Sequence, residues 1–163
     1  MSSSTTQHHD NDNNNDNDQS LCFLTATQLI QGYKNRDFTP AQVTRQILRR
    51  IHQLNPLVRA YNFVEQEQVL LDQCQEALHR YETGTNRLLE GVPISVKDIL
   101  MVTGWRTCYG SKAWVVAQSG QVDGGEVPVD TEDSPSVQRL KEAGAILVGK
   151  VTSPEFGWRM LCC

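Results

Sequence analysis

Lys150 ends a run whose glycine and lysine spacing suggests phosphate chemistry. In GAILVGK, Gly144 is followed after four residues by Gly149 and Lys150. The phosphate-binding loop of nucleotide-hydrolysing proteins begins in the same way, but it needs Ser or Thr after the lysine, because that hydroxyl binds the magnesium ion. Val151 stands there, and the residues between the glycines are apolar and partly β-branched. The run therefore predicts a buried strand and disfavours nucleotide binding.

Lys97 is the second lysine that follows an apolar segment, since it comes directly after GVPISV and before Asp98. Two interpretations of Lys97 stay open from the residues alone. A lysine at the end of a strand can point to solvent, which is the favoured interpretation. Strand ends are, however, also where α/β sheets build their sites, and a partly buried lysine with a lowered pKa can act as a base or a nucleophile.

The elements that would position these lysines are legible from apolar spacing and from capping residues. Thr39 is a suitable N-cap, Pro40 suits the first helical position, and Asn55-Pro56 marks a stop, so we expect a helix over 40–54. Its apolar stripe comprises Val43, Ile47, Ile51 and Leu54. Further helices are expected over 25–36, 65–81 and 135–143, and short strands over 91–96 and 145–150. Helices alternating with buried strands indicate an α/β fold.

Several residue types with chemical potential have simpler interpretations. Cys74 falls in the apolar stripe of the third helix and is expected to be a small core residue, and Cys108 is likewise expected to be a packing residue. His52 lies beside an apolar stripe and is expected at the surface. The segment 118–134 is polar and Gly-rich, which predicts a surface excursion. His8 and His9 lie in a polar tail and are expected to be inert.

The composition divides the chain into a polar tail over 1–20 and a globular part over 21–163. The tail contains no apolar residue except Met1, so it cannot offset its ordering entropy by burial, and we expect it to be disordered. Four of the 19 acidic residues lie in the tail, which leaves as many acidic as basic residues (15 Lys and Arg) in the remainder. That balance disfavours nucleic acid as a partner.

The sequence also indicates in which cellular compartment the protein is expected. No segment approaches the length of a membrane span, and the N-terminus lacks the basic and apolar regions of a signal peptide. The cysteine count is odd, at five, and no two cysteines have C-x-x-C spacing, which argues against a disulfide framework or a zinc site. We therefore expect a cytoplasmic protein.

Three stretches together resemble the amidase signature family: GVPISVKDIL, GWRTCYGS and SVQRLKEAGAILVGKVTSPEFGW. The upstream run TPAQVTRQILRRIHQLNPLVRAYNFV resembles the N-terminal helix of that family, and the resemblance covers roughly residues 24 to 158. It implies N-terminal helices followed by the first strands of the family's mixed sheet. It also implies that 144–150 is a helix-to-strand junction.

The resemblance also implies a chemistry. Family members hydrolyse amides through an acyl-enzyme with a Ser–cis-Ser–Lys triad, in which a neutral lysine acts as base through the bridging serine. Lys97 matches the triad lysine in GVPISVKD. A small-molecule amide would be the substrate, and no cofactor or metal is implied. Glutamine, a fatty acid amide and a small aliphatic or aromatic amide all remain open.

The sequence departs from the family pattern after the EFGW element. The two triad serines belong to Gly- and Ser-rich segments further along, and no such segment occurs in these 163 residues. Ser95, Ser111 and Ser153 do not match the motif of the nucleophile, and Cys162 and Cys163 do not resemble the family continuation. We therefore expect an amidase portion, truncated before the serines, that does not hydrolyse amides alone. The alternative is a non-catalytic interaction module, able to associate with a full-length relative, or a pseudogene product.

Overall fold

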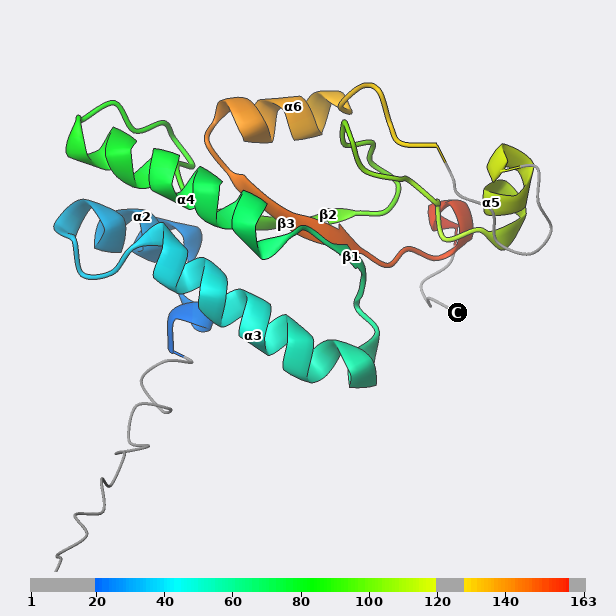
Figure 1. The fold of residues 1–163 in the computed structure, drawn as a ribbon, viewed down its shortest axis with the longest axis horizontal. Helices are drawn as coiled ribbons and strands as arrows, with labels where there is room; N and C mark the ends of the chain where they lie inside the picture. The colour runs from blue at the N-terminus through cyan, green and yellow to red at the C-terminus, as the bar shows by residue number, and fades with distance from the viewer. Residues whose placement is uncertain (1–19, 120–127, 159–163) are drawn as a thin grey trace, which may run out of the picture.

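The structure is a computed structural model that describes residues 20–119 and 128–158 (Figure 1). Residues 1–19 of the predicted disordered tail, part of the predicted surface excursion, Cys162 and Cys163 lie outside the described residues. The elements, in chain order, are η1 (Ser20–Phe23), α2 (Ala26–Asn35), α3 (Pro40–Val58), β1 (Tyr61–Val64), α4 (Glu67–Glu82), β2 (Pro93–Lys97), α5 (Lys112–Ser119), α6 (Pro135–Glu142), β3 (Ile146–Val151) and η2 (Glu155–Gly157).

The four predicted helices are confirmed, and two of them begin with a reciprocal cap. Thr25 accepts a hydrogen bond from the backbone N–H of Gln28, whose side chain accepts one from the Thr25 backbone, and Thr39 and Gln42 repeat the arrangement at α3. Such capping boxes satisfy donors that a helix N-terminus leaves unpaired. Ser134 does not cap α6 through its side chain. Its hydroxyl instead accepts a hydrogen bond from the Met101 backbone N–H at 2.8 Å.

The predicted stop at Asn55-Pro56 is wrong, because α3 continues through Pro56 to Val58. Proline removes one N–H from the helix ladder, and so close to the helix end that loss is small. The Asn55 side chain then secures the exit from the helix. Its amide donates to the Tyr61 carbonyl oxygen at 2.9 Å and accepts from the Tyr61 backbone N–H at 2.8 Å.

One strand and one α-helix were not predicted from the sequence, and neither were the short 3₁₀ helices η1 and η2. The run YNFV, which the resemblance assigned to an N-terminal helix, is strand β1, because the αL residue Arg59 ends α3 and turns the chain. Lys112 onward, expected to be loop, forms α5. The predicted strands are confirmed with shifted ends, as β2 includes Lys97 and β3 reaches Val151.

The three described strands form a mixed sheet in the order β1-β3-β2, with β1 antiparallel and β2 parallel to β3. Helices cover both of its faces, with α3 and α4 on one and α6 on the other (Figure 1). This arrangement confirms the expected α/β class.

A bulge in β3 decides which side chains face which helices. The paired residues of β2 and β3 are Ile94 with Leu147, Ser95 with Gly149, Val96 with Lys150, and Lys97 with Val151. Val148 is therefore skipped. Strict alternation would place Leu147 and Lys150 on opposite faces, and the extra residue brings both to the α6 face.

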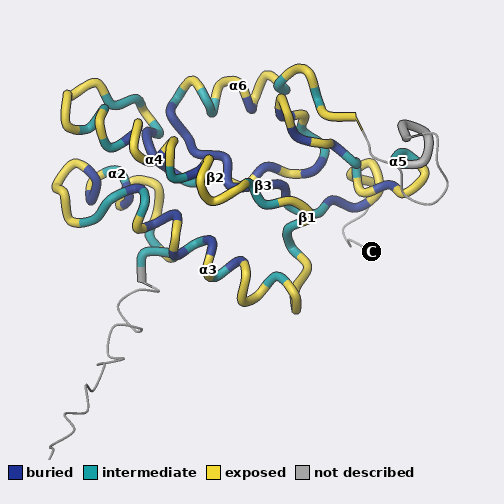
Figure 2. Tube along the Cα trace, in the orientation of Figure 1, coloured by how far each residue is buried: buried dark blue, intermediate teal, exposed yellow. Residues whose placement is uncertain are grey.

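The buried interior lies on both faces of β3, which is the most deeply buried strand (Figure 2). One cluster packs α3 and α4 on the sheet and comprises Leu48, Ile51, Leu70, Cys74, Ile146 and Val148. The cluster on the α6 side comprises Val96, Val102, Trp105, Val137 and Leu147. Cys74 is thus a core residue, as predicted, whereas Leu54 is 38% exposed although it was expected in the apolar stripe.

In the described part of the chain, no helix has the length and apolar character needed to cross a membrane.

Candidate functional site

Lys97 is the last residue of β2 and its side chain is exposed. It shares a face of the strand with Ser95, because side chains two residues apart point the same way. Helix α3 covers this face nearer the start of the strand, at Pro93 and Ser95. Within the described residues, no hydrogen bond or ion pair holds the Lys97 ammonium. The carbonyl oxygen of Lys97 accepts hydrogen bonds from the backbone N–H groups of Ile99 at 2.8 Å and Leu100 at 3.0 Å, which turn the chain sharply after the strand.

Asp98 points to the opposite side of the sheet from Lys97 and is 1% exposed. Its carboxylate accepts hydrogen bonds from the Asn62 side chain at 2.8 Å and from the Cys108 backbone N–H at 3.2 Å. The Lys150 ammonium lies 3.6 Å from the same carboxylate. No role for Asp98 was predicted from the sequence, because a pairing with residues so distant in the chain has no local signal.

The predicted packing role of Cys108 agrees with its surroundings. Its thiol is half-buried, and burial together with the negative charge of Asp98 raises its pKa. Burial also raises the pKa of Cys74, whose thiol donates to the Thr44 hydroxyl at 3.3 Å. A raised pKa keeps both thiols protonated near neutral pH, when they are poor nucleophiles.

None of the three serines set aside in the sequence lies in hydrogen-bond contact with Lys97. Ser95 bonds the Tyr61 hydroxyl, Ser111 donates to a Glu155 carboxylate oxygen at 2.7 Å, and Ser153 donates to the Pro154 carbonyl oxygen at 2.9 Å. The described residues therefore bring together a lysine and an anchored turn, and no partner hydroxyl.

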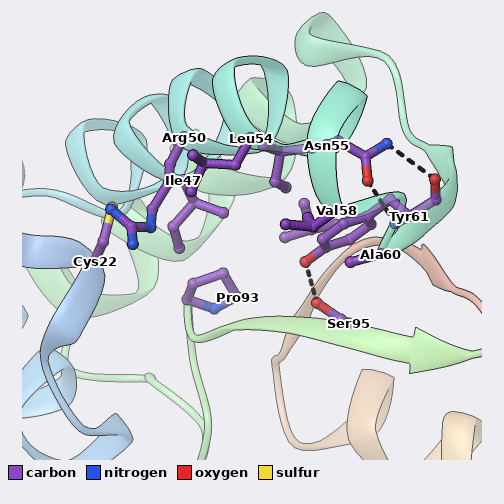
Figure 3. A pocket seen from close by; sticks show the side chains of 12 residues that line it. Cys22, Ile47, Arg50, Leu54, Asn55, Val58, Ala60, Tyr61, Pro93 and Ser95 are labelled. Carbon is purple, nitrogen blue, oxygen red and sulfur yellow. Dashed lines mark hydrogen bonds between the residues drawn. The ribbon is translucent and has the colours of Figure 1, made fainter.

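A pocket of about 340 Å³ lies between α3 and the sheet on the Lys97 face (Figure 3). Tyr61 and Ser95 meet across its floor, and Ile47, Leu54 and Val58 contribute apolar walls. Arg50 lies near its other end, with its guanidinium 4.8 Å from the centre of the Phe23 ring. Lys97 follows Ser95 along the strand, so the pocket and the lysine lie on one side of the sheet.

The family model for amidases matches residues 42–162, which include Lys97 and all three strands. The chain belongs to the amidase family. It is 35% identical over 133 residues to a glutamyl-tRNA(Gln) amidotransferase subunit of Geobacter sp., a match that covers 82% of this chain and 25% of the relative. It is 29% identical over 143 residues to an acylamidase of Rhodococcus erythropolis, a match that covers 86% of this chain and 27% of that enzyme.

Solved amidase structures share the fold. A bacterial aryl acylamidase of the amidase signature family matches 87% of this chain with a TM-score of 0.72 at 19% identity, and that match covers 28% of the enzyme. The peptide amidase of Stenotrophomonas maltophilia matches 85% of the chain with a TM-score of 0.70 at 22% identity, and that match covers 26% of the enzyme. The chain thus spans about a quarter of the length of the amidases it matches.

Proposed function

We propose that this chain is the lysine-bearing portion of an amide hydrolase and that Lys97 is the base of its Ser–cis-Ser–Lys triad. The observation that carries the proposal is the placement of Lys97. It ends a strand that is parallel to its neighbour, within the residues matched to the amidase family, and its amine is exposed rather than tied into an ion pair in the described part of the chain. Strand ends of this kind are where α/β sheets place reactive groups.

The proposed chemistry needs a neutral amine. In the complete enzyme, a covering segment would remove water from Lys97, and desolvation lowers the pKa of a lysine. The neutral amine would accept a proton from the bridging serine, which in turn activates the nucleophilic serine for attack on the amide carbon. Backbone N–H groups near the nucleophile would stabilise the oxyanion. Both serines would come from the remainder of the amidase domain.

The test is kinetic and uses the complete enzyme that contains this sequence. Ammonia or amine release is measured over a panel of glutamine, fatty acid amides and small aliphatic and aromatic amides. Lys97→Ala should lower kcat on the preferred amide by about a thousandfold or more, since the members of such a triad act as a unit. Lys112→Ala, which removes an exposed lysine at the start of α5, is the matched control and should retain the full rate. A Lys97→Ala enzyme with normal kcat would refute the assignment.

The open edges of the sheet favour the alternative of an interaction module. Because β3 is central, β1 and β2 each present one edge without a partner strand among the described residues. Unpaired strand edges accept further strands through main-chain hydrogen bonds. A stable complex with a full-length amidase at low micromolar concentration, together with amide hydrolysis that does not depend on Lys97, would favour this function.

A further inference from the structure

Lys150 is fully buried and has two carboxylates within ion-pair distance. Its side chain is 0% exposed, and its ammonium lies 3.6 Å from Asp98 Oδ1 and 3.5 Å from Asp130 Oδ2. It also donates a hydrogen bond to the Thr107 hydroxyl, which donates in turn to Asp130 at 2.5 Å. A buried ammonium that is held on three sides is not accessible to a substrate, so Lys150 is not itself a base for hydrolysis.

The residues around Lys150 come from separate segments that the fold must hold together. Asp98 begins the turn after β2, Thr107 lies in the loop that follows, and Asp130 precedes α6. Asp130 is tied further to the Val102 backbone N–H at 3.2 Å. One lysine on the central strand therefore joins the end of β2 to both loops on the α6 side of the sheet.

The consequence for Lys97 follows from strand geometry. Lys97 and Asp98 are consecutive, so their side chains leave the backbone on opposite sides of the sheet. The contacts on the α6 side hold the Asp98 carboxylate in place and so restrict rotation of the backbone at residues 97 and 98. This restriction fixes the direction in which the Lys97 side chain leaves the strand on the α3 side. The hydrogen bond from the Asp98 backbone N–H to the Val151 carbonyl oxygen at 3.0 Å fixes the same point from the strand side.

We propose that Lys150 is a positioning residue for Lys97, which acts through Asp98 and the turn that follows β2. The proposal rests on the proposed function, in which Lys97 is the base. It assigns a role to the lysine of the GAILVGK run that needs no phosphate. Because the bulge at Val148 brings Lys150 to the α6 face, the bulge is part of the same device.

The experiment measures two properties of the full chain at submicromolar concentration. Hydrogen exchange, read by mass spectrometry, reports the protection of residues 98–108. Acylation by an acetyl N-hydroxysuccinimide ester between pH 7 and 10, read on the peptide that contains Lys97, reports the environment of that amine. The variants are Lys150→Met and the double variant Lys150→Met/Asp98→Asn. Lys34→Met is the control, because it removes an exposed ammonium from the last turn of α2.

Lys150→Met should raise exchange in residues 98–108 by about tenfold or more, while α3 and α4 keep their protection. It should also change the pH profile of Lys97 acylation. The double variant should show the same two effects, although its net charge equals that of the wild type. The effects would then come from the lost anchoring of the turn after β2 and not from the loss of a charge near Lys97. Lys34→Met should leave both properties at the wild-type values.

Wild-type protection of 98–108 and a wild-type acylation profile in Lys150→Met would overturn the proposal. If Lys150→Met instead loses protection throughout the chain, the double variant decides, since it buries no unpaired carboxylate at position 98. If the double variant regains exchange protection in α3 and α4 but not in residues 98–108, the positioning role is supported. If it regains protection in all of these segments, the positioning role is refuted. Neither readout requires catalysis, so a failure of the proposed function would appear separately, as amide hydrolysis that survives Lys97→Ala.

Discussion

Lys97 and Lys150 lie at the same end of two paired parallel strands, yet their side chains have opposite environments. Both follow apolar runs, and their sequence contexts look alike. Lys97 is exposed on the α3 side, whereas Lys150 is buried on the α6 side among carboxylates. The skipped residue in β3 produces this difference, and no local sequence signal reports strand register.

Gly149 should not tolerate a side chain, because its position is closely covered. A Cβ at Gly149 would lie 2.3 Å from the Phe63 carbonyl oxygen and 2.9 Å from the Val64 Cα, both backbone atoms of β1. Gly149→Ala should therefore separate β1 from β3 and lower the free energy of unfolding by about 2–4 kcal/mol. Urea denaturation measures the loss.

Gly84→Ala is the control for Gly149→Ala, because a Cβ at Gly84 meets nothing within 4 Å. Gly84 has a positive φ of 69°, so alanine is strained there, and we expect Gly84→Ala to lower the free energy of unfolding by only about 1 kcal/mol. Equal stability of the two variants would contradict the packing argument.

Glu90 is expected to make the folding stability of the chain depend on pH in the acid range. Burial opposes its ionisation, but hydrogen bonds from Arg87 and the charges of Arg87 and Arg80 outweigh burial and lower the pKa of Glu90 below its usual 4.5. A lowered pKa in the folded state contributes stability that is present above the unfolded-state pKa and is lost as the pH falls through the folded-state pKa. Wild-type stability should therefore decline below about pH 4.5, as measured by urea denaturation at a series of pH values.

Glu90→Gln removes the titrating group. The variant should be less stable at pH 7 by about 2 kcal/mol, because it loses the ion pairs with two arginines, and its decline below pH 4.5 should be shallower. Parallel acid curves for the two proteins would show that Glu90 does not contribute to the pH dependence.

At the scale of elements, the connection from α3 to β1 depends on one side chain. Asn55 bonds both the N–H and the carbonyl of Tyr61, so it fixes the point at which the chain leaves the helix and enters the sheet. Asn55→Ala should lower the free energy of unfolding by about 1–2 kcal/mol and accelerate hydrogen exchange of the Tyr61 backbone amide. The control is Gln53→Ala, an exposed position on the same helix. An unchanged Tyr61 amide in Asn55→Ala would contradict this role.

The helices were predictable from the sequence because their signals are local. Thr39, Pro40 and the apolar spacing that follows predicted where α3 begins, whereas Pro56 misled the prediction of its end, since a single lost hydrogen bond near a helix terminus is tolerated. Strand β1 was missed because four residues carry little periodicity, and YNFV becomes a strand through its pairing with β3.

The candidate site was predictable only in part, for a similar reason. Lys97 was identified through its resemblance to a family motif, and its place at the end of β2 agrees with the apolar run before it. The contacts among Asp98, Asp130 and Lys150 join segments that are far apart in the chain. Spacing along a sequence does not report such contacts, and the lysine at their centre was therefore interpreted only as the end of a strand.

At the scale of the whole molecule, large apolar side chains are exposed at the end of α3 and directly after η2. Leu57 is 80% exposed, Val58 64% and Trp158 88%. Exposed apolar side chains favour association. We expect the 163-residue chain alone to associate as its concentration rises through the micromolar range and to bind a hydrophobic dye, as measured by analytical ultracentrifugation and fluorescence. A monomer at 100 μM without dye binding would contradict this expectation.

The proposed function requires that Lys97 belong to a triad whose serines lie further along the complete protein. The most direct test is to read the mature transcript beyond the codon for Trp158, in all frames. We predict a continuation that encodes two Gly- and Ser-rich segments carrying the triad serines, so that the encoded enzyme contains the whole amidase domain. A transcript that stops after Cys163 and encodes no such segment in any frame would contradict this assignment and exclude amide hydrolysis by the Lys97 mechanism.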